Sequence, residues 1–175
     1  GTGADEFAGD GIYSGTIPGL SGAAGNTLLA FMVRATDRAE GTPATATFPA
    51  GAPAREALVR VGEPIAANAF GTYRLWLTRA TVNAWSAREK MSNEDLDGTF
   101  VYGTNRVFYN IGAHYSGSSY TSPGYDSPVG ALCGYDLNFR DDDRFLGETQ
   151  STLDWPIRDD TAQREQLMFW FLEQY

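Results

Sequence analysis

The sequence predicts a β-rich α+β fold for this chain of 175 residues. Short segments rich in β-branched and aromatic residues recur about every ten residues, separated by Gly, Pro, Ser and Asn, which is typical of strands. Two other segments, near residues 79–90 and 161–175, have apolar residues at helical spacing. Strands and helices do not alternate regularly, which favours α+β over α/β. We expect a β-sandwich-like portion at 1–62 and a mixed α+β region with two helices at 63–175.

The first portion shows four candidate strands. They are DGIYSGTIPG, which alternates around Tyr13 and Ile17, TLLAFMVRAT at 27–36, ATATFPA at 44–50, and REALVRVG at 55–62. Four strands are too few for a complete immunoglobulin-like sandwich. Either the rest of the chain completes the sheet, or the module is truncated at its N-terminus.

The second portion begins after a Gly-, Pro- and Ala-containing linker at 62–71. We expect a strand at 72–78, and then a helix that buries Val82 and Trp85 and is capped by Thr78 or Thr81. Two paired strands should follow. They are GTFVYG and TNRVFYNIGAHYS, joined by a tight turn at 103–105.

The last third of the chain contains a long connection, one more strand and a helix. GSSYTSPGYDSP at 117–128 precedes the strand ALCGYDLNF, and the acidic segment 140–160 is predicted to be irregular. Thr161 is expected to cap a strongly apolar C-terminal helix. Because that helix has no C-cap before the chain ends, we expect the α+β region to be truncated there. Its apolar face is a candidate surface for homo-oligomerisation.

Charge and composition exclude several classes of protein. The formal net charge is −9, and the basic residues are twelve Arg and the single Lys90, without a cluster. Binding to nucleic acid or to an anionic membrane is therefore disfavoured. No apolar run approaches the roughly 20 residues that cross a bilayer. The opening stretch has no basic end followed by an apolar segment, so no signal peptide is expected in this chain.

Cysteine and histidine each occur once, as Cys133 and His114. A single cysteine excludes an intrachain disulfide and a cysteine-based zinc site. Any catalytic triad depends on His114. Ser116 or Ser118 as nucleophile, His114 as base and Asp126 as orienting group together have the residue types of a hydrolase. No G-x-S-x-G elbow is present.

Three stretches, at 73–128, 134–148 and 159–174, together resemble the CotH-like proteins, which are atypical, kinase-related proteins named after a spore-coat protein. The resemblance is to the large, secreted, multidomain type of bacteria, in which a module with a DGxYSGTIPG-like stretch precedes the CotH-like region. It implies a kinase-like fold, ATP binding with Mg²⁺ or Mn²⁺, phosphorylation of protein, and an extracellular or cell-surface location. The family carries basic residues on the strand that matches Gly134–Phe139, where this chain has none, so we expect weak or no kinase activity from the chain alone.

Nucleotide binding would use the Gly- and Ser-rich stretch after the long strand. Backbone N–H groups and hydroxyls there can contact phosphate, with Arg106 as the nearest cation in sequence. The candidates are Arg106, Gly112, Ser116, Gly117, Ser118 and Ser119. A plain surface connector is the alternative. Its tyrosines, Tyr115, Tyr120 and Tyr125, either bind a glycan or protein partner or pack the segment down.

Two acidic groups are candidate metal sites. Asp141, Asp142 and Asp143 offer carboxylate oxygens for Mg²⁺ or Mn²⁺, unless they form a solvated acidic face. Asp5 and Asp10, before Gly11, offer a Ca²⁺ site, unless they belong to an ordinary turn.

Glu165 on the C-terminal helix is the remaining catalytic candidate. In a kinase-like fold it would pair with a phosphate-binding cation. Alternatively, it is an acid that stabilises the N-terminus of the helix through the helix dipole.

Three functions follow from these observations. The first is a portion of a CotH-like, kinase-related surface protein with a metal-nucleotide site. The second is a non-catalytic extracellular module that binds carbohydrate or protein, and the third is a hydrolase that uses His114.

Overall fold

The computed structural model describes residues 15, 17, 19–20, 24–62, 72–104, 106–117, 125–130, 133–154, 161 and 163–174. Several predictions lie outside these residues. They are the strand around Tyr13, most of the linker at 62–71, the candidates Asp5, Asp10, Ser118 and Ser119, and Tyr120 of the aromatic segment.

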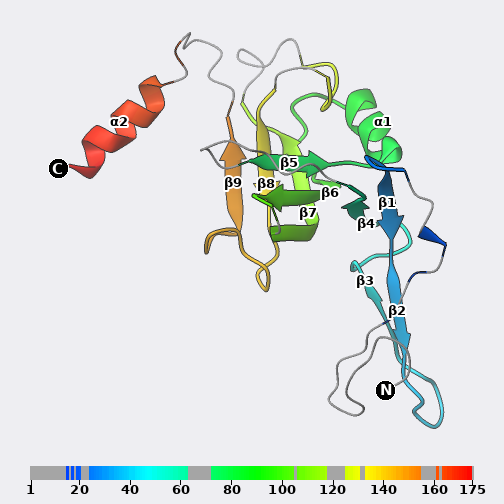
Figure 1. Cartoon of the computed structure of the whole chain (residues 1–175). Coiled ribbons are helices and arrows are strands. Elements are labelled where there is room, and N and C mark those ends of the chain that lie inside the picture. Colours follow the sequence, from blue (N-terminus) through cyan, green and yellow to red (C-terminus); the bar gives the residue numbers. More distant parts are fainter. Residues whose placement is uncertain are drawn as a thin grey trace. The chain divides into compact units, whose positions relative to one another are not determined.

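The predicted β-rich α+β class is confirmed by an antiparallel five-stranded sheet and two helices. The strands are hydrogen-bonded in chain order: β5 (Tyr73–Trp76), β6 (Leu96–Tyr102), β7 (Arg106–Tyr115), β8 (Tyr135–Asn138) and β9 (Gln150–Leu153). α1 (Arg79–Ala87) connects β5 to β6, and α2 (Arg164–Glu173) follows β9 (Figure 1).

The sheet curls because β7 contains a bulge. Gly98 pairs with Ile111 but Phe100 pairs with Phe108, so β7 has one extra residue opposite β6. Asn110, inside that bulge, adopts a left-handed backbone with φ 57°, which asparagine tolerates better than most residues. The extra residue changes which side chains face the core, from Phe108 before the bulge to odd-numbered residues after it.

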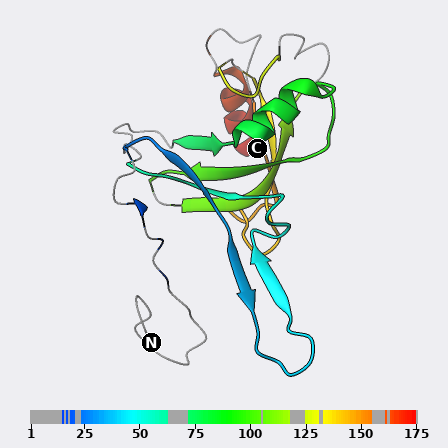
Figure 2. The ribbon, with the colours of Figure 1, turned by 90° about the vertical axis from the view of Figure 1, so that its right-hand side faces the viewer.

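The core occupies one face of this sheet. Its aromatic part is formed by side chains that contact one another edge-on or stacked: Phe100, Phe108, Phe139 and Phe145. α1 lies along the sheet and adds Trp85, which is 1% exposed, to the same cluster (Figure 2). The opposite face of the sheet, called the outer face below, carries the side chains that alternate with the core residues.

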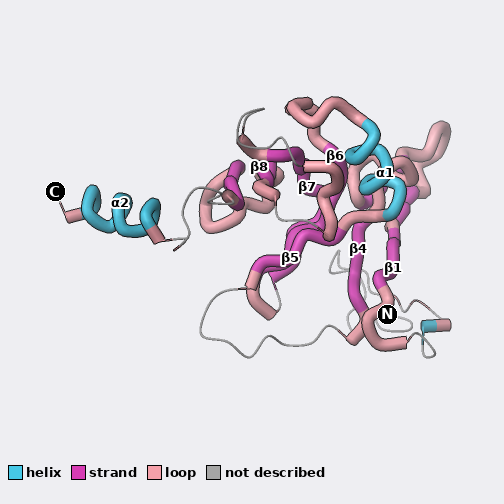
Figure 3. The backbone as a smooth tube through the Cα atoms, turned by 90° about the horizontal axis from the view of Figure 1, so that it is seen from above, coloured by secondary structure: helices cyan, strands magenta, loops and turns pink. Residues whose placement is uncertain are grey.

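α1 begins where the sequence predicts. Of the two candidate caps, Thr78 is the N-cap, because its hydroxyl accepts a hydrogen bond from Thr81 N at 3.0 Å. Trp85 is the one residue of the helix that is buried. α1 contacts β6, the strand that follows it in the chain (Figure 3).

The first part of the chain forms two-stranded pairs. β1 (Leu28–Phe31) pairs with β4 (Ala57–Arg60), and β2 (Val33–Thr36) pairs antiparallel with β3 (Thr45–Phe48). The single strand predicted at 27–36 is therefore divided at Met32. The chain separates into two compact units, residues 1–29 with 59–64 and residues 30–58 with 65–175.

Within the larger unit, side chains join residues 30–58 to the five-stranded sheet. Phe31 and Phe48 each contact the ring of Tyr109 edge-on, at centroid distances of 5.6 Å. The guanidinium of Arg55 donates to Asp97, and Leu58 N donates to Thr99 Oγ1 at 3.2 Å. These contacts fix the segment before β4 against β6 and β7.

The predicted irregular segment at 140–160 differs from the structure. β9 lies within it, and isolated bridges join Arg140 to Asp143 and Phe145 to Glu148. The pattern Gln-Ser-Thr-Leu of β9 has a single large apolar residue, Leu153, so its β period is hard to detect from the sequence.

α2 forms, but its expected start is wrong. It begins at Arg164 after Gln163, which makes no side-chain capping hydrogen bond, so Thr161 is not its cap. The apolar side chains from Leu167 to Leu172 are 53–65% exposed. Neither described helix is long and apolar enough to cross a membrane.

Candidate functional site

The predicted nucleotide-binding residues that the structure describes are distributed along β7, with Gly112 inside the strand. Arg106 begins the strand, and Ser116 and Gly117 follow its last residue. At about 3.3 Å per residue, these ends are roughly 30 Å apart, too far to contact one phosphate group. The structure therefore separates the predicted set into two regions, which are described in turn.

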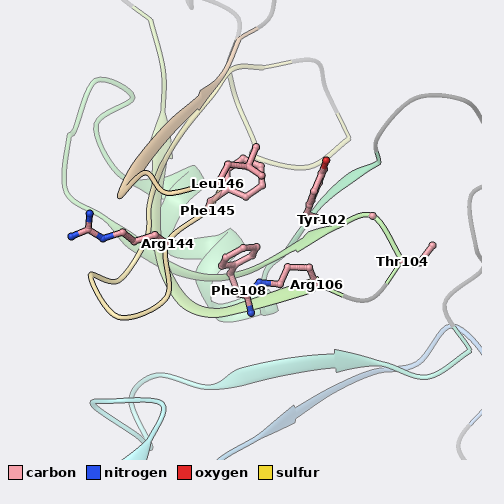
Figure 4. Close-up of a pocket in the computed structure, with 8 residues that line it drawn as sticks. Tyr102, Thr104, Arg106, Phe108, Arg144, Phe145 and Leu146 are labelled. Carbon is pink, nitrogen blue, oxygen red and sulfur yellow. The ribbon is translucent and has the colours of Figure 1, made fainter.

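The first region is a hollow beside Arg106, with a volume of about 490 Å³ (Figure 4). We call it the aromatic hollow. It is lined by Tyr102, Gly103, Thr104, Arg106, Phe108, Arg144, Phe145 and Leu146. Its lining combines aromatic and aliphatic side chains with two arginines, and its volume lies within the range typical of small-molecule pockets.

Arg106 lies against an aromatic ring of this hollow. Its guanidinium carbon is 4.2 Å from the centroid of the Phe108 ring, a cation–π contact. The same guanidinium forms an ion pair with Asp143. Both side chains are substantially exposed, so this pair contributes only about 0–1 kcal/mol to stability. An anionic ligand can displace Asp143 at little cost.

The three aspartates predicted to bind a metal face different arginines. Asp142 accepts two hydrogen bonds from Arg140, at 2.8 and 2.9 Å, which lower the pKa of its carboxyl. Asp141 lies 3.7 Å from Arg144, and Asp143 pairs with Arg106. Among the described residues, no group of three or more His, Cys, Asp or Glu side chains is placed to hold a metal ion.

The second region is a polar network on the outer face, around the single histidine. His114 Nδ1 lies 2.9 Å from Asp95 Oδ1, and His114 Nε2 lies 3.6 Å from Asp136 Oδ2. Asn138 donates to both oxygens of Asp95 at 2.9 Å. The network also includes Gln150, which donates to Asn138 at 2.9 Å, and Thr152, which donates to Asp136 at 2.5 Å.

Strand register explains why these residues meet. His114 pairs with Asp136 across β7 and β8, and Asp136 pairs with Thr152 across β8 and β9. The next outer-face row contains Gly112, which pairs with Asn138. A Cβ atom at Gly112 would lie 2.3 Å from Asp95 Oδ2, so this glycine makes room for the carboxylate that contacts His114.

Of the members of this network, sequence reasoning singled out only His114 and Gly112. Asp95, Asp136, Asn138, Gln150 and Thr152 were missed. The period-two alternation of YDLN and QSTL could have placed the polar residues of β8 and β9 on one face. The register of β9 could not be predicted, because β9 itself was not expected.

The predicted hydrolase residues are found in different surroundings. Ser116 is 4% exposed at the end of β7, where its Oγ lies so near Gly134 that a Cβ there would be 2.1 Å away. Asp126 forms an ion pair with Lys90 at 2.9 Å. The two nitrogens of His114 instead face Asp95 and Asp136.

The tyrosines described from the aromatic segment pack inward. Tyr115 is 4% exposed, lies 5.2 Å from Trp85 and 5.1 Å from Tyr125 between ring centroids, and burial raises its pKa to about 12. Tyr125 is 7% exposed, and its hydroxyl accepts a hydrogen bond from Gly134 N at 2.9 Å. These positions support the interpretation that the tyrosines hold the segment down.

The remaining predicted catalytic residue, Glu165, lies in the first turn of α2, and its side chain is outside the described part of the structure. Comparison of the chain with protein-family models, with curated proteins and with solved structures gives no match. The resemblance to CotH-like proteins therefore stays a prediction.

Proposed function

We propose that this chain is a portion of a CotH-like, kinase-related protein of the cell surface or exterior, and that the aromatic hollow binds a nucleotide. In this proposal a flat base packs on the aromatic lining, and the phosphates contact Arg106. Mg²⁺ or Mn²⁺ would be carried by the nucleotide phosphates. The chain's own contribution is binding and charge neutralisation, which dominate phosphoryl transfer.

The observation that supports this proposal is the position of Arg106 over the ring of Phe108, at the edge of the hollow. Contact with the ring holds the guanidinium in place, so little side-chain entropy is lost when a ligand binds. A guanidinium is also the side chain best suited to phosphate, because it can donate two parallel hydrogen bonds. Tyr102, Phe145 and Leu146 supply an apolar surface in the same hollow.

Replacing Arg106 with methionine is expected to weaken ATP binding by about 10- to 100-fold, the effect of losing one charge-assisted hydrogen-bonding group. Methionine keeps an apolar stem over Phe108 but removes the charge. Asp143→Asn should have the opposite sign and tighten binding, because it releases Arg106 from its ion pair. Calorimetric titration with ATP, with and without Mg²⁺, measures both effects.

The matched control is Arg38→Met, which removes an exposed arginine from the turn between β2 and β3. It should leave ATP affinity unchanged. No heat up to millimolar ATP would refute a nucleotide site in this chain. A different result would be binding heat with oligosaccharides and none with ATP. If Arg106→Met abolishes that heat, the hollow belongs to a carbohydrate-binding module.

We also infer that α2 mediates self-association. Its apolar residues from Leu167 to Leu172 are exposed on all sides, and Trp170 and Phe171 form an edge-on pair with ring centroids 5.2 Å apart. Exposed aromatic and aliphatic surface of this kind favours burial against a partner.

Replacing both Phe169 and Trp170 with serine is expected to convert an oligomer to a monomer, because it removes two of the three aromatic side chains of α2. Analytical ultracentrifugation over a concentration series measures this change. The control is Gln166→Ser, a substitution on the same helix that removes no apolar surface. A wild-type chain that stays monomeric at all concentrations would exclude self-association through α2.

A further inference from the structure

The outer-face network around His114 borders a hollow of about 220 Å³. The hollow is lined by His114, Asp136, Leu137, Asn138, Gln150, Ser151 and Thr152. Asp95 is not part of this lining and contacts the imidazole through Nδ1, whereas Nε2 faces Asp136. The network therefore has a part that orients the imidazole, called the inner part below and made of Asp95 and Asn138, although Asn138 also lines the hollow. The other part, made of His114 Nε2, Asp136, Gln150 and Thr152, is open to a ligand.

The inner part fixes the tautomer of His114. An ionised carboxylate can only accept hydrogen bonds, so the contact of 2.9 Å with Asp95 Oδ1 requires a proton on Nδ1. In the neutral imidazole, Nε2 then carries a lone pair. Asp95 is itself held by Asn138, and Gly112 leaves the space for it. Asp95 is thus a positioning residue that makes Nε2 an acceptor.

The open part of the network has unused acceptors and few unused donors. His114 Nε2 and Asp136 Oδ2 are 3.6 Å apart, too far for a hydrogen bond, and both are acceptors when the imidazole is neutral. The hydroxyl proton of Thr152 is used on Asp136, and one of the two amide protons of Gln150 is used on Asn138, so one N–H donor of Gln150 remains. Lone pairs of Thr152 and the amide oxygen of Gln150 remain. Acceptors outnumber the one remaining donor, so this set favours a ligand that donates hydrogen bonds.

The charge and size of the hollow narrow the ligand further. A carboxylate in a chain of net charge −9 favours a cation. The described residues place no three His, Cys, Asp or Glu side chains for a metal, and about 220 Å³ exceeds what one bare ion fills. A protonated primary amine has three N–H donors, one positive charge and a short alkyl tail.

We propose that the outer-face hollow binds a primary alkylammonium group, held between His114 Nε2 and Asp136 Oδ2. Thr152 and Gln150 supply the remaining acceptors, and Asp95 orients the imidazole. This site is on the opposite face from the aromatic hollow, so it is independent of the proposed nucleotide binding.

NMR of the imidazole tests this proposal directly. His114 is the single histidine of the chain, so its ring ¹⁵N and ¹³C signals need no assignment by mutation. Propylammonium should shift the Nε2 signal in a saturable way at a pH where the ring ¹⁵N signals show a neutral imidazole. Tetramethylammonium, a cation without N–H donors, should bind at least tenfold more weakly. An equal response to both cations would overturn the proposal, as would no shift with millimolar propylammonium.

Two variants separate the roles of the carboxylates. Asp136→Asn should weaken propylammonium binding by about tenfold or more, because it removes the charge that faces the ligand. Asp95→Asn should move the imidazole proton from Nδ1 to Nε2, which the ring ¹⁵N shifts report, and should abolish binding. The control Glu40→Gln removes an exposed carboxylate between β2 and β3 and should change nothing.

A competing explanation is a metal site. If Zn²⁺ shifts the Nε2 signal at lower concentration than propylammonium, and Asp136→Asn abolishes that response, the hollow is a cation site for metal and the ammonium proposal is wrong. If Zn²⁺ leaves the Nε2 signal unchanged at the concentration at which propylammonium saturates the site, the result supports the organic cation.

Discussion

Replacing Phe100 with alanine is expected to lower the free energy of unfolding by about 3–5 kcal/mol. Phe100 is 0% exposed on β6, the second strand of the five-stranded sheet. Its ring contacts Tyr73, Phe108, Phe139 and Phe145, with centroid distances of 5.3–6.1 Å. Alanine would remove both the transfer free energy of the ring and its contacts with these neighbours, which surround it too tightly to collapse fully into the space.

Urea unfolding followed by circular dichroism measures this change. A loss of this size is a large part of the 5–15 kcal/mol typical of a domain, and should lower Tm by about 6–20 °C. The control is Phe169→Ala on α2, which removes the same side chain from a site that is 65% exposed. Both variants are compared at a protein concentration at which the chain is monomeric, because Phe169 belongs to the proposed self-association surface. Equal effects of the two substitutions would show that the aromatic cluster around Phe100 is not the core.

The sequence predicts the strands that carry the aromatic core better than it predicts the strand arrangement in the first part of the chain. The segments 98–103 and 104–116 were predicted as paired strands because their β-branched and aromatic residues alternate and a glycine-containing turn separates them. The structure pairs them as β6 and β7. The prediction of a helix near Thr78 succeeded for the same reason, because a local cap and a local apolar stripe determine it.

The bulge in β7 was not predictable from alternation. It depends on one residue, Asn110, that adopts a left-handed backbone between two regular halves of the strand. From that point the side chains that face the core are those a regular strand would direct outward. The outer-face position of His114 is therefore a consequence of tertiary pairing with β6, which no local pattern encodes.

The candidate sites also depend on tertiary structure that local sequence patterns do not encode. Arg106 was predicted as a phosphate ligand because it is near a Gly- and Ser-rich segment in sequence, yet strand geometry places it roughly 30 Å from Ser116. Its two partners are Phe108, on the same strand, and Asp143, in a turn distant in sequence. Proximity in sequence is a poor guide to proximity in space once a segment is extended.

Trp85 is the residue through which α1 is attached to the sheet, and its replacement with alanine is expected to cost about 3–5 kcal/mol. It is the one buried residue of a helix of nine residues, a length at which an isolated helix is not stable in water. Its ring lies 5.2 Å from Tyr115 and 6.1 Å from Tyr135 between centroids. Without this contact α1 should lose its main tertiary support and unfold.

The matched control for Trp85→Ala is Trp170→Ala, since Trp170 is 53% exposed on α2. Hydrogen exchange separates the two outcomes: Trp85→Ala should remove protection of α1 amides and accelerate exchange in β7 and β8, whereas Trp170→Ala should leave these elements unchanged. Retained protection of α1 in Trp85→Ala would mean that Thr78 and its hydrogen bond to Thr81 suffice to hold the helix. That outcome would contradict the view that α1 is stabilised by tertiary packing, because a single cap contributes only about 0.5–2 kcal/mol.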